Sequence, residues 1–261
     1  MEIRMFQVDA FADELFGGNP AAVCILEEWL PDNIMLSIAG ENNLAETAFC
    51  ILRGDHVELK WFTPEVEIDL CGHATLATSH VLMHELGDFT DEVRYLTRSG
   101  DLVVTRDKDL YCLDFPSRPP AAAHIPRVIR EGIGGESLEI LKARDYFFVF
   151  NSESEVRNIV PDQRLLASIE DAFAGIIITA PGDTTDFVSR FFTPGASVFE
   201  DPVTGSAHCT LIPYWSAKLQ KKVLKAKQLS SRGGELLCEN RGQRVYIRGK
   251  AVTFMRGFIS I

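Results

Sequence analysis

Short apolar stretches separated by Gly, Asp, Asn and Pro recur along the chain, a pattern typical of β-strands. A Pro- and Ala-rich stretch at 117–123 suits neither a strand nor a helix start, and it divides the strands into two sets. We therefore expect two β-rich lobes, 1–118 and 119–261, with a boundary near Pro119 and the last strand left open to pack on the first lobe. The expected strands are 3–11, 21–26, 47–52, 56–62, 93–97, 102–106 and 111–115, then 146–150, 175–180, 187–192, 223–229, 235–239, 244–248 and 252–259.

Only a few stretches predict helices. Residues 73–86 are apolar or small nearly all round and stop at Gly87, which predicts a helix enclosed in a core. A similar stretch at 206–220 contains Pro213, which is expected to kink the helix or to delay its start. Short amphipathic helices are expected at 31–40 and 164–173.

The two halves share an internal repeat. Phe-Thr-Pro occurs at 62–64 and again at 192–194, and each copy is followed by a glycine that opens an apolar helix, Gly72 in the first half and Gly205 in the second. The order of strand, loop, glycine and helix is the same in both, which favours duplication over a chance match. Two similar lobes predict a ligand-binding cleft between them.

The two glycines predict where a small anion would bind. A helix that begins at Gly72 or Gly205 presents unpaired backbone N–H groups and the positive end of its dipole, which suit a carboxylate or a developing oxyanion. Either glycine taken alone is equally explained by a tight turn or close packing. Their occurrence as a pair favours a binding role.

Two carboxylates are candidates for proton transfer. Glu46 lies between a polar loop and an apolar strand, so its carboxylate could be held at the lip of an apolar cavity, as a general base for a carbon acid requires. From spacing alone, a surface glutamate at a strand start is the simpler interpretation. Asp201 precedes the second helix start, and a turn-forming Asp before Pro202 explains it as well as a functional role does.

Three further side chains lie beside the helix starts. His73 belongs to the first turn of its helix, where the dipole disfavours an imidazolium, so a neutral hydrogen-bonding or packing role is expected. Ser206 suits either a ligand-binding hydroxyl or a helix cap. Cys71 precedes Gly72 and could be an activated thiolate, although a buried inert thiol is the simpler interpretation.

Several common catalytic motifs are absent from the sequence. His80 and His84 lack the glutamate position of the HExxH zinc motif, so they are expected to be core histidines. No GxSxG elbow, GxGxxG turn or P-loop lysine occurs. The sequence therefore predicts neither a metal-dependent hydrolase nor a nucleotide-binding enzyme.

Five sequence blocks together resemble the PhzF family of phenazine-biosynthesis-type isomerases. They follow the order of that family and cover most of the chain. The blocks are Val-Asp-Ala-Phe at 8–11 with Gly-Gly-Asn-Pro-Ala-Ala-Val at 17–23, Asn-Leu-Ala-Glu-Thr at 43–47, Phe-Thr-Pro at 62–64, Cys-Gly-His-Ala-Thr at 71–75 and Glu-Asp-Pro-Val-Thr-Gly-Ser-Ala-His at 200–208.

The resemblance implies an α+β, diaminopimelate-epimerase-like fold of two pseudo-symmetric lobes, each a β-barrel-like sheet wrapped around a central helix. It implies a cofactor-independent isomerase, a homodimer, in which a glutamate moves a proton between carbons of a small carboxylate-bearing metabolite. No metal or organic cofactor is expected. By position, the family's catalytic residues correspond to Glu46, His73 and Asp201, and its carboxylate-binding residues to Gly72, Gly205 and Ser206.

Two other functions remain open from the sequence. Epimerases of this fold use one cysteine from each lobe as paired acid and base, and Cys71 lies where the first would be. The corresponding place in the second lobe is expected to be Pro202, which disfavours a cysteine-dependent racemase. A protein that keeps the fold only to bind a metabolite or a partner is the third interpretation, and retention of Glu46, His73 and Asp201 together argues against it.

Composition restricts the partners further. The 261 residues carry a formal net charge of −11, which disfavours binding to nucleic acid or to an anionic membrane. Residues 215–261 nevertheless hold 11 basic and 2 acidic side chains, and we expect them to form the solvated face of the second lobe's closing strands. There is no membrane-length apolar run, no secretory pattern and no CxxC pair among six cysteines, so a cytoplasmic protein with reduced thiols is expected.

Overall fold

The chain folds as two compact units. A computed structural model describes residues 1–169, 175–196 and 198–261. Unit 1 contains Met1–Phe115 and Tyr246–Ile261, and unit 2 contains Pro116–Val245. The last strand, β18 (Ala251–Ser260), pairs with β1 (Glu2–Ala10) along its length. Unit 2 is therefore inserted into the chain of unit 1.

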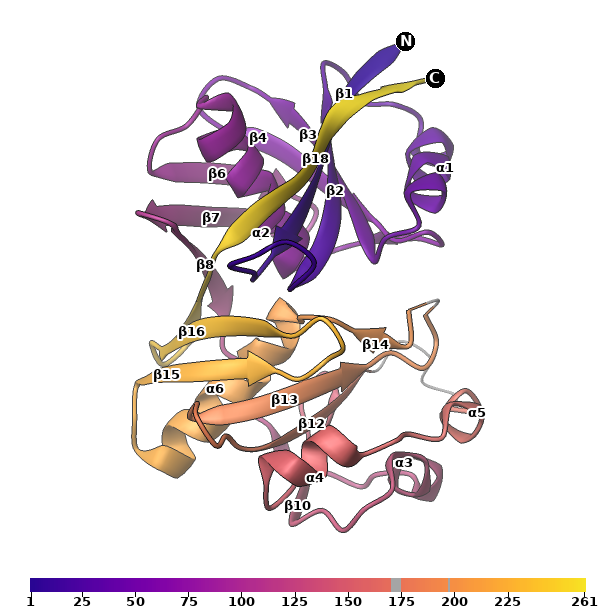
Figure 1. Cartoon of the computed structure of the whole chain (residues 1–261), viewed down its shortest axis with the longest axis vertical. Helices are drawn as coiled ribbons and strands as arrows, with labels where there is room; N and C mark the ends of the chain where they lie inside the picture. The colour runs from indigo at the N-terminus through magenta and orange to yellow at the C-terminus, as the bar shows by residue number, and fades with distance from the viewer. Residues whose placement is uncertain (170–174, 197) are drawn as a thin grey trace. The chain divides into compact units, whose positions relative to one another are not determined.

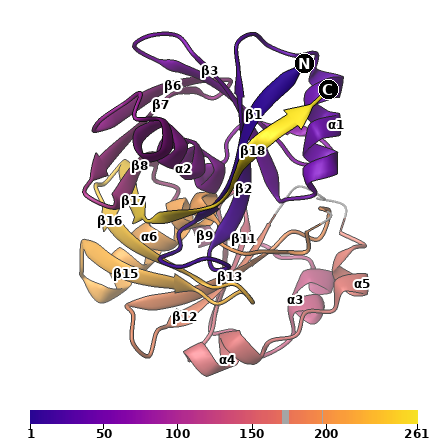
Figure 2. The same cartoon turned by 45° about the horizontal axis from the view of Figure 1, so that its top comes forward.

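Unit 1 is a curved sheet around a buried helix (Figures 1 and 2). Going outward from β18, the strand neighbours are β1, β2, β3, β4, β6, β7 and β8, with β2–β3 and β4–β6 parallel and the other pairs antiparallel. The apolar side chains of these strands turn inward in alternation. The strands are β2 (Asn19–Leu26), β3 (Glu46–Leu52), β4 (Val57–Phe62), β5 (Glu67–Ile68), β6 (Glu92–Thr97), β7 (Gly100–Asp107) and β8 (Leu110–Pro116).

The enclosed helix is α2 (Gly72–His80), continued by a π-helical segment, η1 (Val81–Leu86), that ends at Gly87. All nine residues of α2 are buried, and the helix contacts β1, β2, β3 and β18. Its buried hydroxyl groups are satisfied within the helix, because those of Thr75, Thr78 and Ser79 each donate a hydrogen bond to the backbone carbonyl four residues earlier. The helix expected at 73–86 is confirmed, including its end at Gly87, whose φ is 73°.

Unit 2 repeats this arrangement around α6 (Gly205–Leu219). Its strand neighbours are β10, β11, β12, β13, β15 and β16, with β11–β12 and β13–β15 parallel, as β2–β3 and β4–β6 are in unit 1. The strands are β9 (Ala121–Ala122), β10 (Glu139–Lys142), β11 (Tyr146–Val149), β12 (Ile176–Pro181), β13 (Phe187–Phe192), β14 (Glu200–Asp201), β15 (Val223–Gln228) and β16 (Gly234–Asn240), and β17 (Arg244–Gly249) crosses the boundary between the units.

The Phe-Thr-Pro repeat has the same geometry in both units. β4 ends at Phe62 and β13 at Phe192, and a two-residue strand then returns to pair with the last two residues of each. Gly72 is the fourth residue after β5, and Gly205 is the fourth after β14. The number of residues between Phe-Thr-Pro and the helix-opening glycine differs between the two units, and this difference therefore arises in the loop before the short strand. The counterpart of Cys71, directly before its helix, is Thr204, so the expected correspondence with Pro202 is wrong.

Pro213 neither delays nor ends α6, which runs from Gly205 through it to Leu219. Proline removes the N–H that would bind the carbonyl four residues earlier, which belongs to Cys209. The backbone N–H of Arg118 donates to that carbonyl instead, at 2.9 Å. The hydrogen bond that proline removes is thus supplied by the segment that opens unit 2.

Other local expectations are confirmed in part. The helix expected at 31–40 is α1 (Asp32–Asn42), whereas only the start of the one expected at 164–173 is seen, as α5 (Gln163–Leu166), and residues 170–173 lie outside the described residues. The stretch 117–123 does contribute a two-residue strand, β9, paired with β10. The sequence did not predict α3 (Arg127–Ile133) or α4 (Glu153–Asn158).

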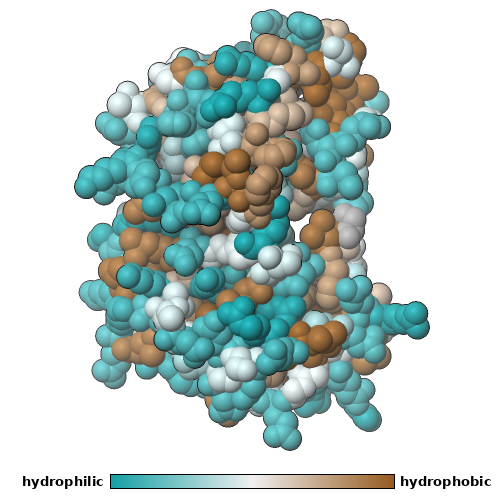
Figure 3. Space-filling model, viewed as in Figure 1, coloured by the Kyte–Doolittle hydropathy of each residue, from teal (hydrophilic) through white to brown (hydrophobic). Residues whose placement is uncertain are grey.

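The basic segment 215–261 does not belong to one lobe. β15 and β16 lie in unit 2, whereas β18 lies in unit 1, so the expectation of a single face on the second lobe is wrong. Figure 3 shows apolar side chains gathered over β18 on this face of unit 1. Phe254 and Phe258 are 47% and 68% exposed. None of the described helices is both long and apolar enough to cross a membrane.

Candidate active site

Glu46 and His73 meet inside unit 1. Glu46 is the first residue of β3, and its partner in the parallel pairing with β2 is Ala21. His73 is the second residue of α2, and its side chain is 4% exposed against 17% for Glu46. Glu46 Oε2 lies 3.0 Å from His73 Nε2. The fold therefore brings together an acid and an imidazole that are 27 positions apart (73 − 46) in the sequence.

Two more side chains surround the ring of His73. The Nδ2 atom of buried Asn19, at the start of β2, lies 3.1 Å from His73 Nδ1. The Sγ atom of Cys71 lies 3.6 Å from the same nitrogen. Because both contacts are on Nδ1, the ring is held with Nε2 toward Glu46.

The distance between Glu46 and His73 is that of a hydrogen bond, but the angles are not. Glu46 Oε2 and His73 Nε2 are both buried, and among the described residues neither has a partner with hydrogen-bond geometry. The 3.0 Å contact is an ion pair when His73 is protonated. Two buried polar atoms at the start of a helix are thus left able to bond a third group.

The protonation states follow from burial and charge. Burial raises the pKa of Cys71, and the charge of Glu46 raises it further, so Cys71 is a thiol at neutral pH. Burial alone would lower the pKa of His73, but the charges of its ionisable neighbours Cys71 and Glu46 raise it well above its usual value. Since Cys71 is a thiol, Glu46 is the charge that matters. The charge of Glu46 thus favours a proton on His73, whereas burial and the Asn19 amide group at Nδ1 favour a neutral ring, and the neutral role expected from the sequence stays a prediction.

The start of α2 adds donors to this group. Gly72 is the first helical residue and is buried, and the side chain of Cys71, at the N-cap position, makes no capping hydrogen bond. The N–H groups of the first turn are therefore not capped by that side chain. They lie next to His73 and can bond an anion or a developing oxyanion.

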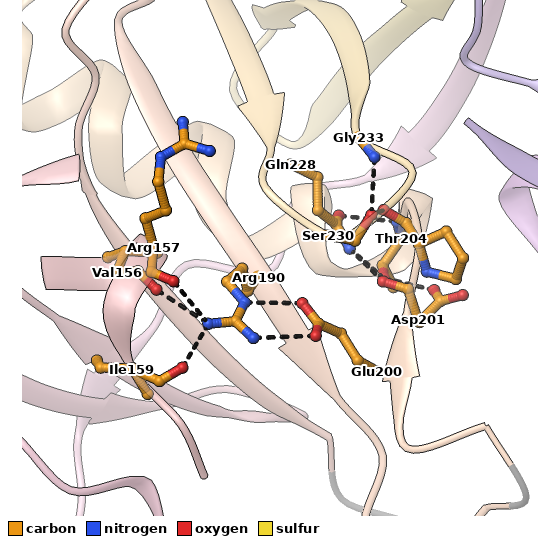
Figure 4. Close-up of polar contacts among 11 residues, drawn as sticks. Val156, Arg157, Ile159, Arg190, Glu200, Asp201, Thr204, Gln228, Ser230 and Gly233 are labelled. Carbon is orange, nitrogen blue, oxygen red and sulfur yellow. Dashed lines mark hydrogen bonds and ion pairs between the residues drawn. The ribbon is translucent and has the colours of Figure 1, made fainter. Parts of the chain in front are cut away.

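Asp201, Gly205 and Ser206 lie together in unit 2 (Figure 4 shows Asp201 and its partners). Asp201 ends β14, and its Oδ2 accepts a hydrogen bond from the hydroxyl of Thr204. Thr204 is the N-cap of α6, but its side chain makes no capping bond because the hydroxyl is directed to Asp201. Ser206 is half-buried in the first turn and is not the cap.

Comparison with known proteins identifies the family. A model of the phenazine biosynthesis-like proteins, PhzC-PhzF, matches residues 8–257. The chain belongs to the PhzC-PhzF family. An uncharacterized isomerase of Pseudomonas aeruginosa is 48% identical over the full length of both chains. The crystal structure of a PhzF family protein from Enterococcus faecalis is 46% identical over the whole of both chains, with a TM-score of 0.95.

The fold extends beyond the PhzC-PhzF family. A hydroxyproline epimerase from Agrobacterium vitis is only 11% identical but has a TM-score of 0.64, with 99% of this chain and 91% of that chain covered. The resemblance seen in the sequence, the diaminopimelate-epimerase-like fold and the assignment to isomerases are confirmed.

Two clusters of the PhzC-PhzF chain have side chains of the type that bind metals: Glu46 with Cys71 and His73, and His80 with His84 and Glu85, each with its ligand atoms within 4.8 Å of one another. In the second cluster, His80 bonds Tyr111 of β8 and Thr253 of β18, and Glu85 pairs with Arg256. His80 is a core histidine, as expected, but His84 is exposed.

The sequence did not assign roles to Asn19, Arg190 or Gln228. Asn19 lies in a block typical of the PhzC-PhzF family, but its contact with His73 depends on tertiary structure. Gln228 occupies an inward-facing place in the alternation of β15, where the other inward residues are Leu224 and Ala226. An uncharged polar residue in such a place is the one signal in the sequence that could have identified it.

Proposed function

We propose that this PhzC-PhzF family isomerase moves a proton between carbon atoms of a small carboxylate-bearing substrate, with Glu46 as general acid and base. The observation that carries the proposal is the buried contact of 3.0 Å between Glu46 and His73, whose facing atoms lack hydrogen-bond geometry within the described chain. A purely structural ion pair would be expected to satisfy both atoms. Neither a metal nor an organic cofactor has a part in the proposed reaction.

The proposed reaction is a 1,3-type proton shift. The carboxylate of Glu46 takes a proton from a substrate carbon, and the electron pair of that C–H bond moves into the neighbouring π system. Glu46, now a carboxylic acid, returns the proton to a different carbon, so that no atom is gained or lost. His73, whose Nε2 lies beside Glu46, stabilises negative charge on the substrate as it develops by donating a hydrogen bond from Nε2.

The substrate carboxylate needs donors of its own. In unit 1 these are the backbone N–H groups at Gly72. We further assign substrate binding to Gly205 and Ser206, and assistance to the transfer to Asp201. These assignments rest on the family resemblance and on the equivalence of the two helix starts. A double-mutant cycle between Glu46 and Asp201 tests whether both residues act on one substrate.

The direct test is solvent deuterium exchange. Wild-type protein in deuterium oxide would be incubated with small amino and hydroxy acids and with a cyclic dihydro-hydroxyanthranilate, and deuterium at carbon followed by NMR. We expect Glu46→Gln to reduce exchange by about 10²–10⁴-fold, because it keeps the shape of the side chain but removes the titrating group. Glu41→Gln, an exposed glutamate of α1, is the matched control. Undiminished exchange in Glu46→Gln would refute the role of Glu46.

A cysteine-dependent racemase is disfavoured by two observations. The pKa of Cys71 is raised, and the equivalent position of unit 2 is Thr204, which has no thiol. Activity lost in Cys71→Ser but kept in Glu46→Gln would replace the proposal by that mechanism. A rise in the melting temperature of the protein with one of these acids, without deuterium exchange into that acid, would indicate a protein that binds the acid but does not turn it over.

A further inference from the structure

The turn before α6 is held by one buried side chain, Gln228 of β15 (Figure 4). Gln228 is fully buried. Its Oε1 accepts a hydrogen bond from the backbone N–H of Thr204 at 2.9 Å, and its Nε2 donates to the backbone carbonyl of Asp201 at 2.7 Å. The side-chain amide thus bridges both ends of the turn that carries Asp201.

These contacts also fix the direction of the hydrogen bonds. A backbone N–H can only donate and a carbonyl can only accept, so the orientation of the Gln228 amide is determined. Nε2 lies 3.2 Å from the Thr204 hydroxyl oxygen and donates to it. The single hydroxyl proton of Thr204 is then directed to Asp201 Oδ2. Donation therefore runs one way, from Gln228 to Thr204 to the Asp201 carboxylate.

Neighbouring contacts hold the rest of the segment in place. The hydroxyl of Ser230 donates to the carbonyl of Pro202 at 2.8 Å. Arg190, on β13, makes two hydrogen bonds to Glu200, at 2.7 and 2.9 Å, and its Nη1 donates to carbonyls at the end of α4, Ile159 at 2.7 Å among them (Figure 4). Gln228 is the member of this set that contacts both Asp201 and Thr204.

We infer that Gln228 is a positioning residue of the isomerase: it fixes the Asp201–Thr204 turn and, through the Thr204 hydroxyl, the orientation of the Asp201 carboxylate. This inference rests on the proposed function, in which Asp201 assists proton transfer. In the described part of the chain, the side chain of Gln228 makes its hydrogen bonds to Asp201 and Thr204, so it acts through the turn and not on the substrate.

The test compares Gln228→Glu with Gln228→Leu. A carboxylic acid can donate to the Asp201 carbonyl as the amide does, whereas a carboxylate cannot, and it also competes with Asp201 for the Thr204 proton. We expect Gln228→Glu to approach wild-type deuterium exchange at pH 5 and to fall at least 10-fold relative to wild type at pH 8. Gln228→Leu is expected to be at least 10-fold slower at every pH, and Gln163→Glu, at an exposed position of α5, to match wild type.

A second readout needs no substrate. The Thr204 amide proton, bonded by Gln228 Oε1, is expected to exchange with solvent at least 10-fold faster in Gln228→Leu, with unchanged exchange in unit 1. If both Gln228 variants keep wild-type rates and pH profiles while Glu46→Gln is inactive, the positioning role is wrong and the proposed function stands. If Glu46→Gln keeps full activity, the proposed function fails, and faster Thr204 exchange then supports only a structural role for Gln228.

Discussion

At the scale of single residues, the groups around a buried histidine decide the direction in which its pKa shifts. His73 lies at a helix start, where the dipole is equivalent to about half a positive charge and disfavours an imidazolium. A full carboxylate charge 3.0 Å away in a buried site opposes the dipole and raises the pKa of His73. His80 lies farther from its carboxylate, 3.9 Å from Glu85, and the ring of His208 contacts the carbonyl of Thr204. Burial lowers the pKa of each of these two histidines to about 4.

The low pKa values of these two histidines predict that the folded protein loses stability in acid. An unfolded histidine binds a proton near pH 6.5, whereas His80 and His208 resist protonation until about pH 4 in the folded state. The free energy of unfolding therefore holds the full contribution of the two neutral histidines above pH 6.5. It loses that contribution as the pH falls from 6.5 to 4, on the order of 3 kcal/mol for each histidine. Urea denaturation between pH 7 and pH 4 measures this loss.

Substitution of each histidine distinguishes its effect on acid stability from the effects of other titrating groups. His208→Asn keeps a donor for the Thr204 carbonyl but cannot become an imidazolium, so we expect a shallower loss of stability below pH 6.5. His80→Gln should act likewise, and exposed His124→Gln should follow wild type. Equal slopes in all four proteins would show that buried histidines do not control acid stability.

At the scale of elements, the turn between β1 and β2 has little freedom. Gly18 has a φ of 61°, and a Cβ there would lie 2.1 Å from the carbonyl oxygen of Ala10. A methyl group cannot fit unless the turn moves. The next residue is Asn19, which contacts His73, so the turn also sets part of the candidate site.

Gly18→Ala is expected to lower the free energy of unfolding by more than about 2 kcal/mol, since it adds a backbone clash to left-handed strain. Gly54→Ala is the matched control, because Gly54 has a φ of 75° with no atom within 4 Å of the added Cβ. The control should lose only about 1 kcal/mol. Urea midpoints give both values, and equal losses would refute the clash.

Sequence patterns predicted the secondary-structure elements better than they predicted the tertiary contacts between them. Alternation located most strands, and the apolar stretch 73–86 located the enclosed helix, because these signals are local. The continuation of α6 through Pro213 was not predictable, since the compensating N–H belongs to Arg118, distant in sequence. The local context singled out Glu46 and Asp201 as candidates and the resemblance gave them roles, whereas the roles of Asn19 and Gln228 emerged only from tertiary contacts.

At the scale of the whole molecule, duplication explains the two units, but the chain does not divide into consecutive halves. Unit 1 takes its first strand and its last from opposite ends of the sequence. β18 pairs with β1, and two of its side chains hold the end of the enclosed helix: Thr253 bonds His80, and Arg256 pairs with Glu85. Unit 1 therefore depends on a strand that follows unit 2.

A chain that ends at Lys250 is expected to lose the fold of unit 1 while unit 2 stays folded. Hydrogen exchange followed by mass spectrometry should show rapid exchange in β1 to β4 and native protection in β11 to β13. A chain that ends at Ser260 should behave like wild type, because it keeps the whole of β18. Native protection of β1 in the shorter chain would show that β18 is dispensable.

The pairing of β1 with β18 also sets the order in which the protein matures during synthesis. Translation proceeds from the N-terminus, so β1 is synthesised before unit 2 and its partner β18 after it. Unit 2 is continuous in sequence and is fully synthesised before β18. The unit that contains Glu46 and His73 is thus started before unit 2 and completed after it, and the sheet around the candidate acid–base pair stays incomplete until β18 has been synthesised.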